Sequence, residues 1–161
     1  VHLRRALVSY DAILLDAYSE NRYGSFIPYH LATKEFFELV NRRLTTNGIV
    51  AYNVMGTLGG WQADVLGSVY RTLAAVFPHV YLFPAQGSQN VVLIATKSAQ
   101  RRDRVYLEQQ AADLIQSGRI KLPTFRTRLA QLTVDPPASF KNCQVLTDDF
   151  APVDGLLSKG R

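Results

Sequence analysis

Two largely apolar runs, each of the length of a β-strand, constrain the fold of this chain most. The first covers residues 10–17 and carries an acid near its end, and the second covers residues 49–54. Neither run alternates between apolar and polar residues, and continuous runs of this kind are typical of strands covered on both faces. Between them, residues 33–44 carry an apolar stripe at helical spacing, formed by Phe36, Phe37, Val40 and Leu44. The pattern predicts two parallel strands joined by a right-handed helical crossover.

The chain then repeats this order once and changes direction. A helical pattern over residues 61–77 is stopped by Pro78, and strand patterns follow over residues 80–83 and 90–96. The turn between these last two strands is short, which favours antiparallel neighbours. The sequence therefore predicts an α/β fold with a partial Rossmann-like sheet of the class I methyltransferase type. We expect this sheet to be mostly parallel, to end in an antiparallel hairpin and to be flanked by helices.

Local signals set the boundaries of the first long helix. Thr33 is placed to cap its N-terminus, and Glu35 lies in the first turn, where a carboxylate interacts favourably with the helix dipole. Asn47-Gly48 predicts its end, with the glycine in a left-handed conformation. The polar stretch from Ser19 to Pro28 predicts a loop between the first strand and this helix.

The character of the chain changes after Ser98. Residues 103–117 predict a polar amphipathic helix, residues 125–132 predict a shorter one, and the rest reads as a tail. We expect residues 1–98 to be the C-terminal half of a Rossmann-like catalytic domain and residues 99–161 to be a helical extension and tail. The chain begins at Val1 without a methionine, which leads us to expect that it was cut from a longer protein.

Composition narrows the class of protein further. The single cysteine, Cys143, excludes an internal disulfide framework and fits a reducing compartment, so we expect a cytoplasmic protein. The chain contains no apolar run of about 20 residues, and we expect no membrane contact from it. Its net charge of +5 comes from scattered basic residues, which are typical of solvated helix faces, and we expect no nucleic-acid partner.

Asp16 is the main candidate for chemistry. It ends the first predicted strand, and ligands of open α/β sheets bind at the carboxyl ends of the strands. A carboxylate there could act as a general base or hold a cationic substrate. It could equally cap the following loop by accepting backbone N–H groups. Position alone leaves both interpretations open.

Several motifs, taken in order, point to one family. They are Tyr-Asp-apolar-Asp at the end of the first strand, Thr-x-Glu-Phe-Phe opening the helix, and Leu-x-x-x-Gly leading into the second strand. Phe-Pro-x-Val and Asn-x-x-Leu-Ile-Ala follow, and Leu146 to Asp154 form a tail motif. Together they resemble the C-terminal half of spermidine synthase and the related polyamine aminopropyltransferases. The resemblance covers Val1 to about Lys97, and the tail motif also resembles that of family members fused to membrane segments.

The resemblance implies an activity and a set of site residues. Enzymes of this family move an aminopropyl group from decarboxylated S-adenosylmethionine to putrescine, and the matching residue for the base that deprotonates the amine is Asp16. We expect substrate contacts from Tyr18, Ser19, Glu20, Asn53, Asp148 and Asp149, and a contact with the donor from Ala17. The cofactor expectation is that none is tightly bound, with decarboxylated S-adenosylmethionine or S-adenosylmethionine as a co-substrate. The expected partners are a small-molecule amine and further copies of the chain.

The acceptor side departs from the family pattern. Ser19, with Glu20 beside it, stands where the family has a second aspartate, and Asn53-Val54-Met55 replaces a Gln-Gly-Glu stretch. The glycine-rich turn that would bind the donor does not occur in the chain, so we expect the chain alone to be inactive. Two alternatives therefore stay open. One is a methyltransferase relative that depends on S-adenosylmethionine, and the other is a non-catalytic assembly domain that uses Trp61 and an exposed sheet edge.

Overall fold

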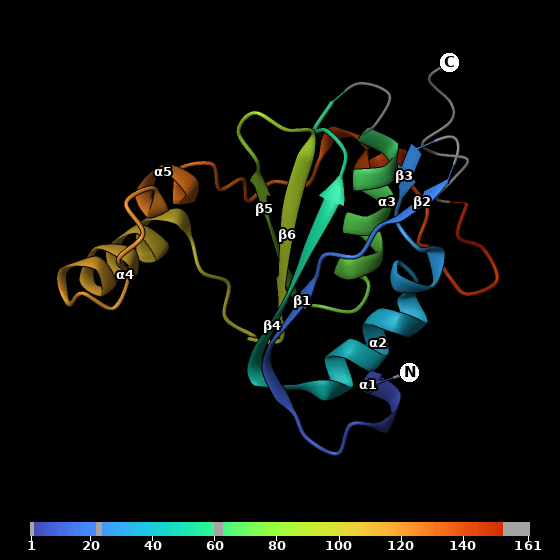
Figure 1. Ribbon diagram of the computed structural model, residues 1–161, viewed down its shortest axis with the longest axis horizontal. Coiled ribbons are helices and arrows are strands. Elements are labelled where there is room, and N and C mark those ends of the chain that lie inside the picture. The colour runs from blue at the N-terminus through green and yellow to red at the C-terminus, as the bar shows by residue number, and fades with distance from the viewer. Residues whose placement is uncertain (1, 22–23, 60–62, 153–161) are drawn as a thin grey trace.

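A four-stranded sheet forms the centre of the computed structural model, which describes residues 2–21, 24–59 and 63–152 (Figure 1). Its strand order is β1-β4-β6-β5. The strands are β1 (Tyr10–Leu15), β4 (Leu44–Met55), β5 (His79–Pro84) and β6 (Asn90–Thr96). β1 and β4 are parallel, whereas β6 is antiparallel to both of its neighbours, β4 and β5. The α/β fold with its antiparallel closing hairpin is thus as the sequence predicts, with the last strand inserted between β4 and β5.

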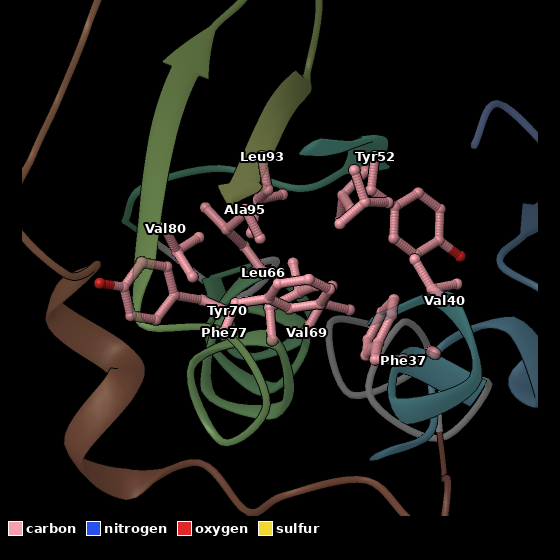
Figure 2. Packing of buried hydrophobic residues seen from close by; sticks show 14 of the residues in the cluster. Phe37, Val40, Tyr52, Leu66, Val69, Tyr70, Phe77, Val80, Leu93 and Ala95 are labelled. Carbon is pink, nitrogen blue, oxygen red and sulfur yellow. The ribbon is translucent and has the colours of Figure 1, made fainter. Parts of the chain in front are cut away.

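Helices α1 (His2–Arg5), α2 (Lys34–Arg43) and α3 (Ala63–Ala74) precede or connect these strands. As predicted, Thr33 caps α2, because its hydroxyl accepts a hydrogen bond of 3.3 Å from the N–H of Phe36. α2 and α3 lie on the same side of the sheet (Figure 1). Their apolar stripes pack on alternate residues of β4 and β6 to form the hydrophobic core (Figure 2). Phe37 is fully buried there, with its ring 6.1 Å from that of Tyr52 on β4.

The predicted end of α2 is wrong. The helix ends at Arg43, and residues 44–48 already belong to β4. Gly48 is not among the glycines with positive φ, so it is no left-handed helix cap. A Cβ atom at this position would lie 2.9 Å from the Cβ of Leu44. Any residue other than glycine would therefore force the neighbouring atoms to move. Glycine is required here because the chain folds back closely as it enters the strand, and the β1–β4 register shifts at the same point.

The prediction that the first strand is covered on both faces is also wrong. β1 lies at an edge of the sheet, with β4 as its neighbour in the described residues. Ile13 is buried against the core, but Ala12 is exposed and the side chain of Leu14 is 75% exposed. The helices α2 and α3 cover one face of the sheet, and nothing in the described residues covers these side chains on the other. A continuous apolar run therefore marks a strand with a bare apolar face here.

The segment predicted as a loop contains regular structure. Residues Ser19–Asn21 (β2) and Gly24–Phe26 (β3) pair as a short antiparallel hairpin, and a 3-10 turn (η1, Tyr29–Leu31) leads into α2. Elsewhere the boundaries differ by a few residues. The helix predicted over residues 61–77 ends at Ala74 in the structure.

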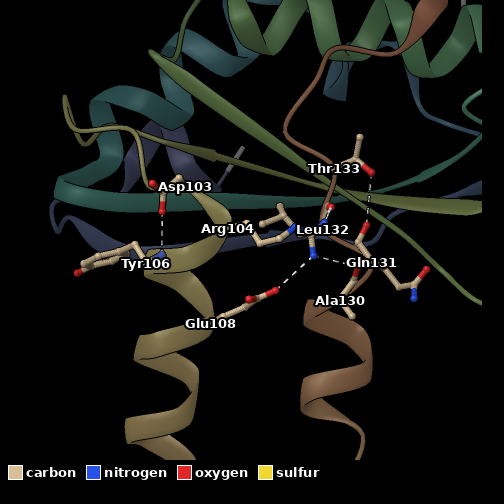
Figure 3. Close-up of polar contacts among 8 residues, drawn as sticks. All are labelled: Asp103, Arg104, Tyr106, Glu108, Ala130, Gln131, Leu132 and Thr133. Carbon is tan, nitrogen blue, oxygen red and sulfur yellow. Dashed lines mark hydrogen bonds and ion pairs between the residues drawn. The ribbon is translucent and has the colours of Figure 1, made fainter.

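A helical arm leaves the sheet after β6 (Figure 1). It consists of α4 (Arg104–Gln116), capped by the carboxylate of Asp103, and α5 (Phe125–Leu129), which is shorter than predicted. Arg104 joins the two helices, because its guanidinium donates to the carbonyls of Ala130 and Leu132 that follow α5 (Figure 3). Thr133 then pairs with Leu82 of β5 through two backbone hydrogen bonds of 2.8 and 3.0 Å.

The tail returns to the helical face of the sheet. A 3-10 turn (η2, Ala138–Asn142) packs on α3, with the ring of Phe140 5.4 Å from that of Tyr70. The side chain of Leu146 is buried, and the backbone of Leu146 links α2 to α3. Its carbonyl accepts from the N–H of Lys34 at 2.8 Å, and its N–H donates to the hydroxyl of Thr72 at 2.9 Å.

Replacing Thr72 by valine is expected to lower the free energy of unfolding by about 1–3 kcal/mol. The hydroxyl of Thr72 is buried and also donates to the carbonyl of Ser68 at 2.7 Å, so valine keeps the shape but leaves the N–H of Leu146 buried without its partner. Urea unfolding measures the change. Thr45→Val is the matched control, because the hydroxyl of Thr45 bonds to Asp11 at an exposed position. Equal effects of the two substitutions would contradict this role of Thr72.

Candidate functional site

Asp16 lies at the carboxyl edge of the two parallel strands. It directly follows β1, and the register pairs the last residue of β1, Leu15, with Tyr52 of β4. The residue after Tyr52 is Asn53, so the ends of β1 and β4 bring an acid and an amide to one place. The Nδ2 of Asn53 donates to Oδ1 of Asp16 at 3.0 Å. Both belong to the residues predicted from the sequence, and Asp16 is exposed to solvent.

Tyr18 completes this group. Its hydroxyl donates to the backbone carbonyl of Asn53 at 2.8 Å, which ties the segment after β1 to the end of β4. The side chain of Tyr18 is half-buried. Burial and, to a smaller degree, the negative charge of Asp16 raise the pKa of Tyr18 to about 12, while a hydrogen bond with the backbone of Met55 acts in the opposite direction. Tyr18 is therefore a neutral hydrogen-bond donor at ordinary pH. The group presents one carboxylate to solvent, and the amide of Asn53 holds it through a hydrogen bond.

Sequence reasoning missed Tyr52 as a neighbour of this site. Its ring lies in the core, and its hydroxyl is buried with no hydrogen-bond partner among the described residues. In Figure 2 this hydroxyl points away from Leu66 and Val69. Burial raises the pKa of Tyr52, and proximity to Tyr18 raises it further. The available signal was a single aromatic residue in the strand pattern of residues 49–54, directly before Asn53.

The titration of Tyr18 can be measured from the ultraviolet absorbance of phenolate. We expect the difference between the wild-type chain and Tyr18→Phe to have a midpoint near pH 12, above the ordinary value of 10.0. Because the pKa in the folded state lies above that of the unfolded chain, the stability contributed by Tyr18 is present below pH 10. It falls as the pH rises from 10 through about 12.

Asp16→Asn provides the control for this titration. It removes the smaller of the two causes, so the midpoint for Tyr18 should fall but remain above 10.0. A midpoint at 10 in the unsubstituted chain would show that Tyr18 is exposed, and would contradict its place beside Asn53.

The structure describes only some of the other residues predicted to lie around Asp16. Ala17 and Ser19 are half-buried and continue from Asp16 into β2, where Ser19 pairs with Phe26. The backbone of Glu20 pairs with Ser25, but the side chain of Glu20 lies outside the described part of the chain. Its predicted contact with an amine remains a prediction. Trp61, predicted to bind a partner, also lies outside the described residues.

Asp148 and Asp149 occupy the tip of an exposed turn. Two backbone hydrogen bonds of 3.0 Å between Thr147 and Phe150 close this turn. The N–H of Asp148 donates to the carboxylate of Glu35 at 3.0 Å, which fastens the turn to the first turn of α2. The contacts described for Asp148 thus lead to α2 and not to Asp16. The structure brings Asp16, Tyr18 and Asn53 together, and it leaves the role of this acidic turn as a prediction.

Two curated proteins match nearly the whole chain. A polyamine aminopropyltransferase of Vibrio vulnificus is 26% identical over 160 residues, which are 97% of this chain. A probable polyamine aminopropyl transferase of Bifidobacterium longum is 29% identical over 163 residues, covering 91% of this chain. The chain is thus similar to polyamine aminopropyltransferases over nearly its whole length. It spans half the length of the Vibrio protein and about a third of the Bifidobacterium protein (50% and 34%).

A solved structure agrees with this relationship at the level of the fold. Human methyltransferase-like protein 13, in complex with SAH, superimposes with a TM-score of 0.61 at 26% identity. The match covers 73% of this chain and 52% of the human chain. No family model matches the sequence. In the described residues, no helix has both the length and the apolar character needed to cross a membrane.

Proposed function

We propose that this chain carries the amine-binding side of an aminopropyltransferase, with Asp16 as the general base. The observation that supports this proposal most is the position of Asp16 at the carboxyl edge of β1, where it is exposed and accepts a hydrogen bond from Asn53. In addition, the curated proteins that are similar to this chain are polyamine aminopropyltransferases. The co-substrate would be decarboxylated S-adenosylmethionine, and the acceptor a small aliphatic amine. We assign residues 1–98 to the catalytic half-domain and residues 99–161 to the extension and tail, in a cytoplasmic protein.

The chemistry requires a base at this position. An alkyl ammonium must lose a proton before its nitrogen can attack the propyl carbon next to the donor's sulfonium. As the new N–C bond forms, the C–S bond breaks and the sulfonium becomes a neutral thioether. Asp16 would bind the ammonium and accept its proton. Asn53 would hold the carboxylate in place through its 3.0 Å hydrogen bond, and the hydroxyl of Tyr18 would fix the strand end from which Asn53 projects.

We propose that a donor-binding half pairs with β1 in the active protein. Two observations support this: β1 is an edge strand whose Leu14 is 75% exposed, and the chain spans about half of its Vibrio relative. A further parallel strand would extend the sheet beyond the edge formed by β1, and an accompanying helix would cover Leu14 and Ala12. Without such a half, the same edge favours association between copies of this chain.

Calorimetric titration tests whether donor binding requires the proposed additional half of the protein. Decarboxylated S-adenosylmethionine, S-adenosylmethionine and putrescine are titrated into this chain and into a longer polypeptide that continues upstream of Val1. We expect the decarboxylated donor to bind saturably to the longer polypeptide alone. Absence of binding by all three compounds to both polypeptides would contradict the proposal and favour a non-catalytic domain.

Two observations favour a second candidate function. The solved structure with a TM-score of 0.61 is a methyltransferase-like protein in complex with SAH, and Ser19 replaces the second acid of the acceptor loop. A methyltransferase relative would prefer S-adenosylmethionine over its decarboxylated form in the same titration. It would also retain activity when Asp16 is replaced by asparagine, whereas the aminopropyltransferase would not.

A further inference from the structure

A cavity of about 730 Å³ lies between the helical arm and the sheet, on the face opposite α2 and α3. One wall comes from β5 and β6, and the other comes from the end of the arm. Apolar side chains form most of both walls, namely Phe83, Val92, Ile94, Leu122, Phe125 and Leu129. The volume lies within the range of about 300–1,000 Å³ typical of small-molecule sites. Asp16, Tyr18 and Asn53 do not line it, so it is separate from the proposed catalytic site.

Both ends of the arm are fastened to neighbouring residues of β5, which fixes the shape of this cavity. At the start of the arm, the N–H of Arg102 donates to the hydroxyl of Tyr81 at 2.7 Å. At its end, Thr133 and Leu82 exchange two backbone hydrogen bonds. Between these points, Arg104 bonds to the carbonyls that follow α5 (Figure 3). The wall that carries Phe125 is therefore held by bonded contacts at the base of the arm.

The electrostatic character of the cavity is positive. Arg128 on α5 is the one charged residue among those that line it. Within the described part of the chain, Arg128 has no ion-pair partner. The surrounding segment from residue 114 to residue 134 contains four basic residues and no acid: Arg119, Lys121, Arg126 and Arg128. A single cation in the lining of an otherwise apolar cavity is complementary to a ligand that is apolar along its length and anionic at one end.

We propose that this cavity binds a monoanionic amphiphile, an unbranched alkyl chain that ends in a carboxylate. The alkyl chain lies along Phe83 and Ile94, between the sheet and Phe125. The carboxylate pairs with the guanidinium of Arg128, and the amides of Gln86 and Gln131 add hydrogen-bond donors to the lining.

Calorimetric titration of this chain with sodium dodecanoate, below the concentration at which it forms micelles, tests the proposal. We expect saturable binding of one molecule per chain. Arg128→Gln should weaken that binding at least tenfold, because it removes a charge-assisted hydrogen bond. Arg126→Gln is the matched control on the same short helix, because Arg126 does not line the cavity, and it should change affinity less than twofold. Dodecyltrimethylammonium, with the same alkyl chain and the opposite charge, should bind at least tenfold more weakly.

Three results would overturn the proposal. Equal weakening by Arg128→Gln and Arg126→Gln would indicate attraction to the general positive charge of the arm. Equal affinity for the two detergents would indicate apolar adsorption without a role for the cation. Absence of saturable binding would leave the apolar lining as a surface for a protein segment. None of these tests depends on Asp16, so the proposal of amphiphile binding can be tested whether or not the proposed catalytic function is correct.

Discussion

Replacing Asp16 by asparagine is expected to lower the rate of aminopropyl transfer by about 10²–10⁴-fold in a longer polypeptide that includes this chain and is active. Asparagine keeps the size of the side chain but cannot accept the proton of the attacking ammonium. Asp16 is exposed and is held by one described hydrogen bond, from Asn53, so the fold should not depend on its charge. The expected result is a loss of kcat with unchanged affinity for decarboxylated S-adenosylmethionine and an unchanged unfolding midpoint.

Asp11→Asn is the matched control for this substitution. Asp11 lies near the other end of β1, is exposed, and accepts a single described hydrogen bond of 2.9 Å from the hydroxyl of Thr45. It carries the same charge on the same strand but lies away from the carboxyl edge. Transfer rates should therefore change little in Asp11→Asn. If both substitutions reduce the rate equally, the effect of Asp16 is one of general charge, and its role as the base would be refuted.

Replacing Phe37 by alanine is expected to lower the free energy of unfolding by about 3–5 kcal/mol. Phe37 is fully buried between α2 and the sheet, where it packs edge-on against Tyr52 with ring centroids 6.1 Å apart. Truncation leaves a cavity beside the strand that carries Asn53. Urea unfolding of purified protein measures this change in the free energy of unfolding. The loss is a large fraction of the total free energy of unfolding of an ordinary domain.

Phe36→Ala is the control, one residue earlier on the same helix. Phe36 is only partly buried at the margin of the same cluster, so alanine should cost about 1–2 kcal/mol. The contrast tests the orientation of α2, because a rotation of the helix by one residue would exchange the two effects. Equal costs for the two phenylalanines would contradict the packing shown in Figure 2.

The strand and helix order could be predicted because each element carries its own periodicity. The run from Asn90 to Thr96 and the cap at Thr33 are local signals, and the structure confirms both. The open face of β1 could not be predicted, because Leu14 reads identically whether or not a second layer of helices covers it. The role of Gly48 was misjudged for a related reason. Its requirement comes from the close approach of Leu44, which depends on the fold and not on the preceding helix.

The candidate site shows the same division. Asp16 could be found from its place at a strand end, and Asn53 from the resemblance to the aminopropyltransferases. Their hydrogen bond depends on the register of β1 and β4, which sequence patterns do not specify when a register shift intervenes. The cavity beneath the arm arises from packing between distant segments, as does the hydroxyl of Tyr52, which has no hydrogen-bond partner among the described residues. No local sequence pattern predicts either feature.

A direct assay of aminopropyl transfer tests whether the protein catalyses this reaction with Asp16 as the general base. Decarboxylated S-adenosylmethionine and putrescine are incubated with a longer polypeptide that contains this chain, and new polyamine is measured chromatographically, with Asp16→Asn in parallel. We expect the unsubstituted polypeptide to form spermidine and Asp16→Asn to lose this activity. Formation of spermidine at the same rate by both would contradict the assignment of Asp16, and transfer of a methyl group from S-adenosylmethionine instead would contradict the proposed function.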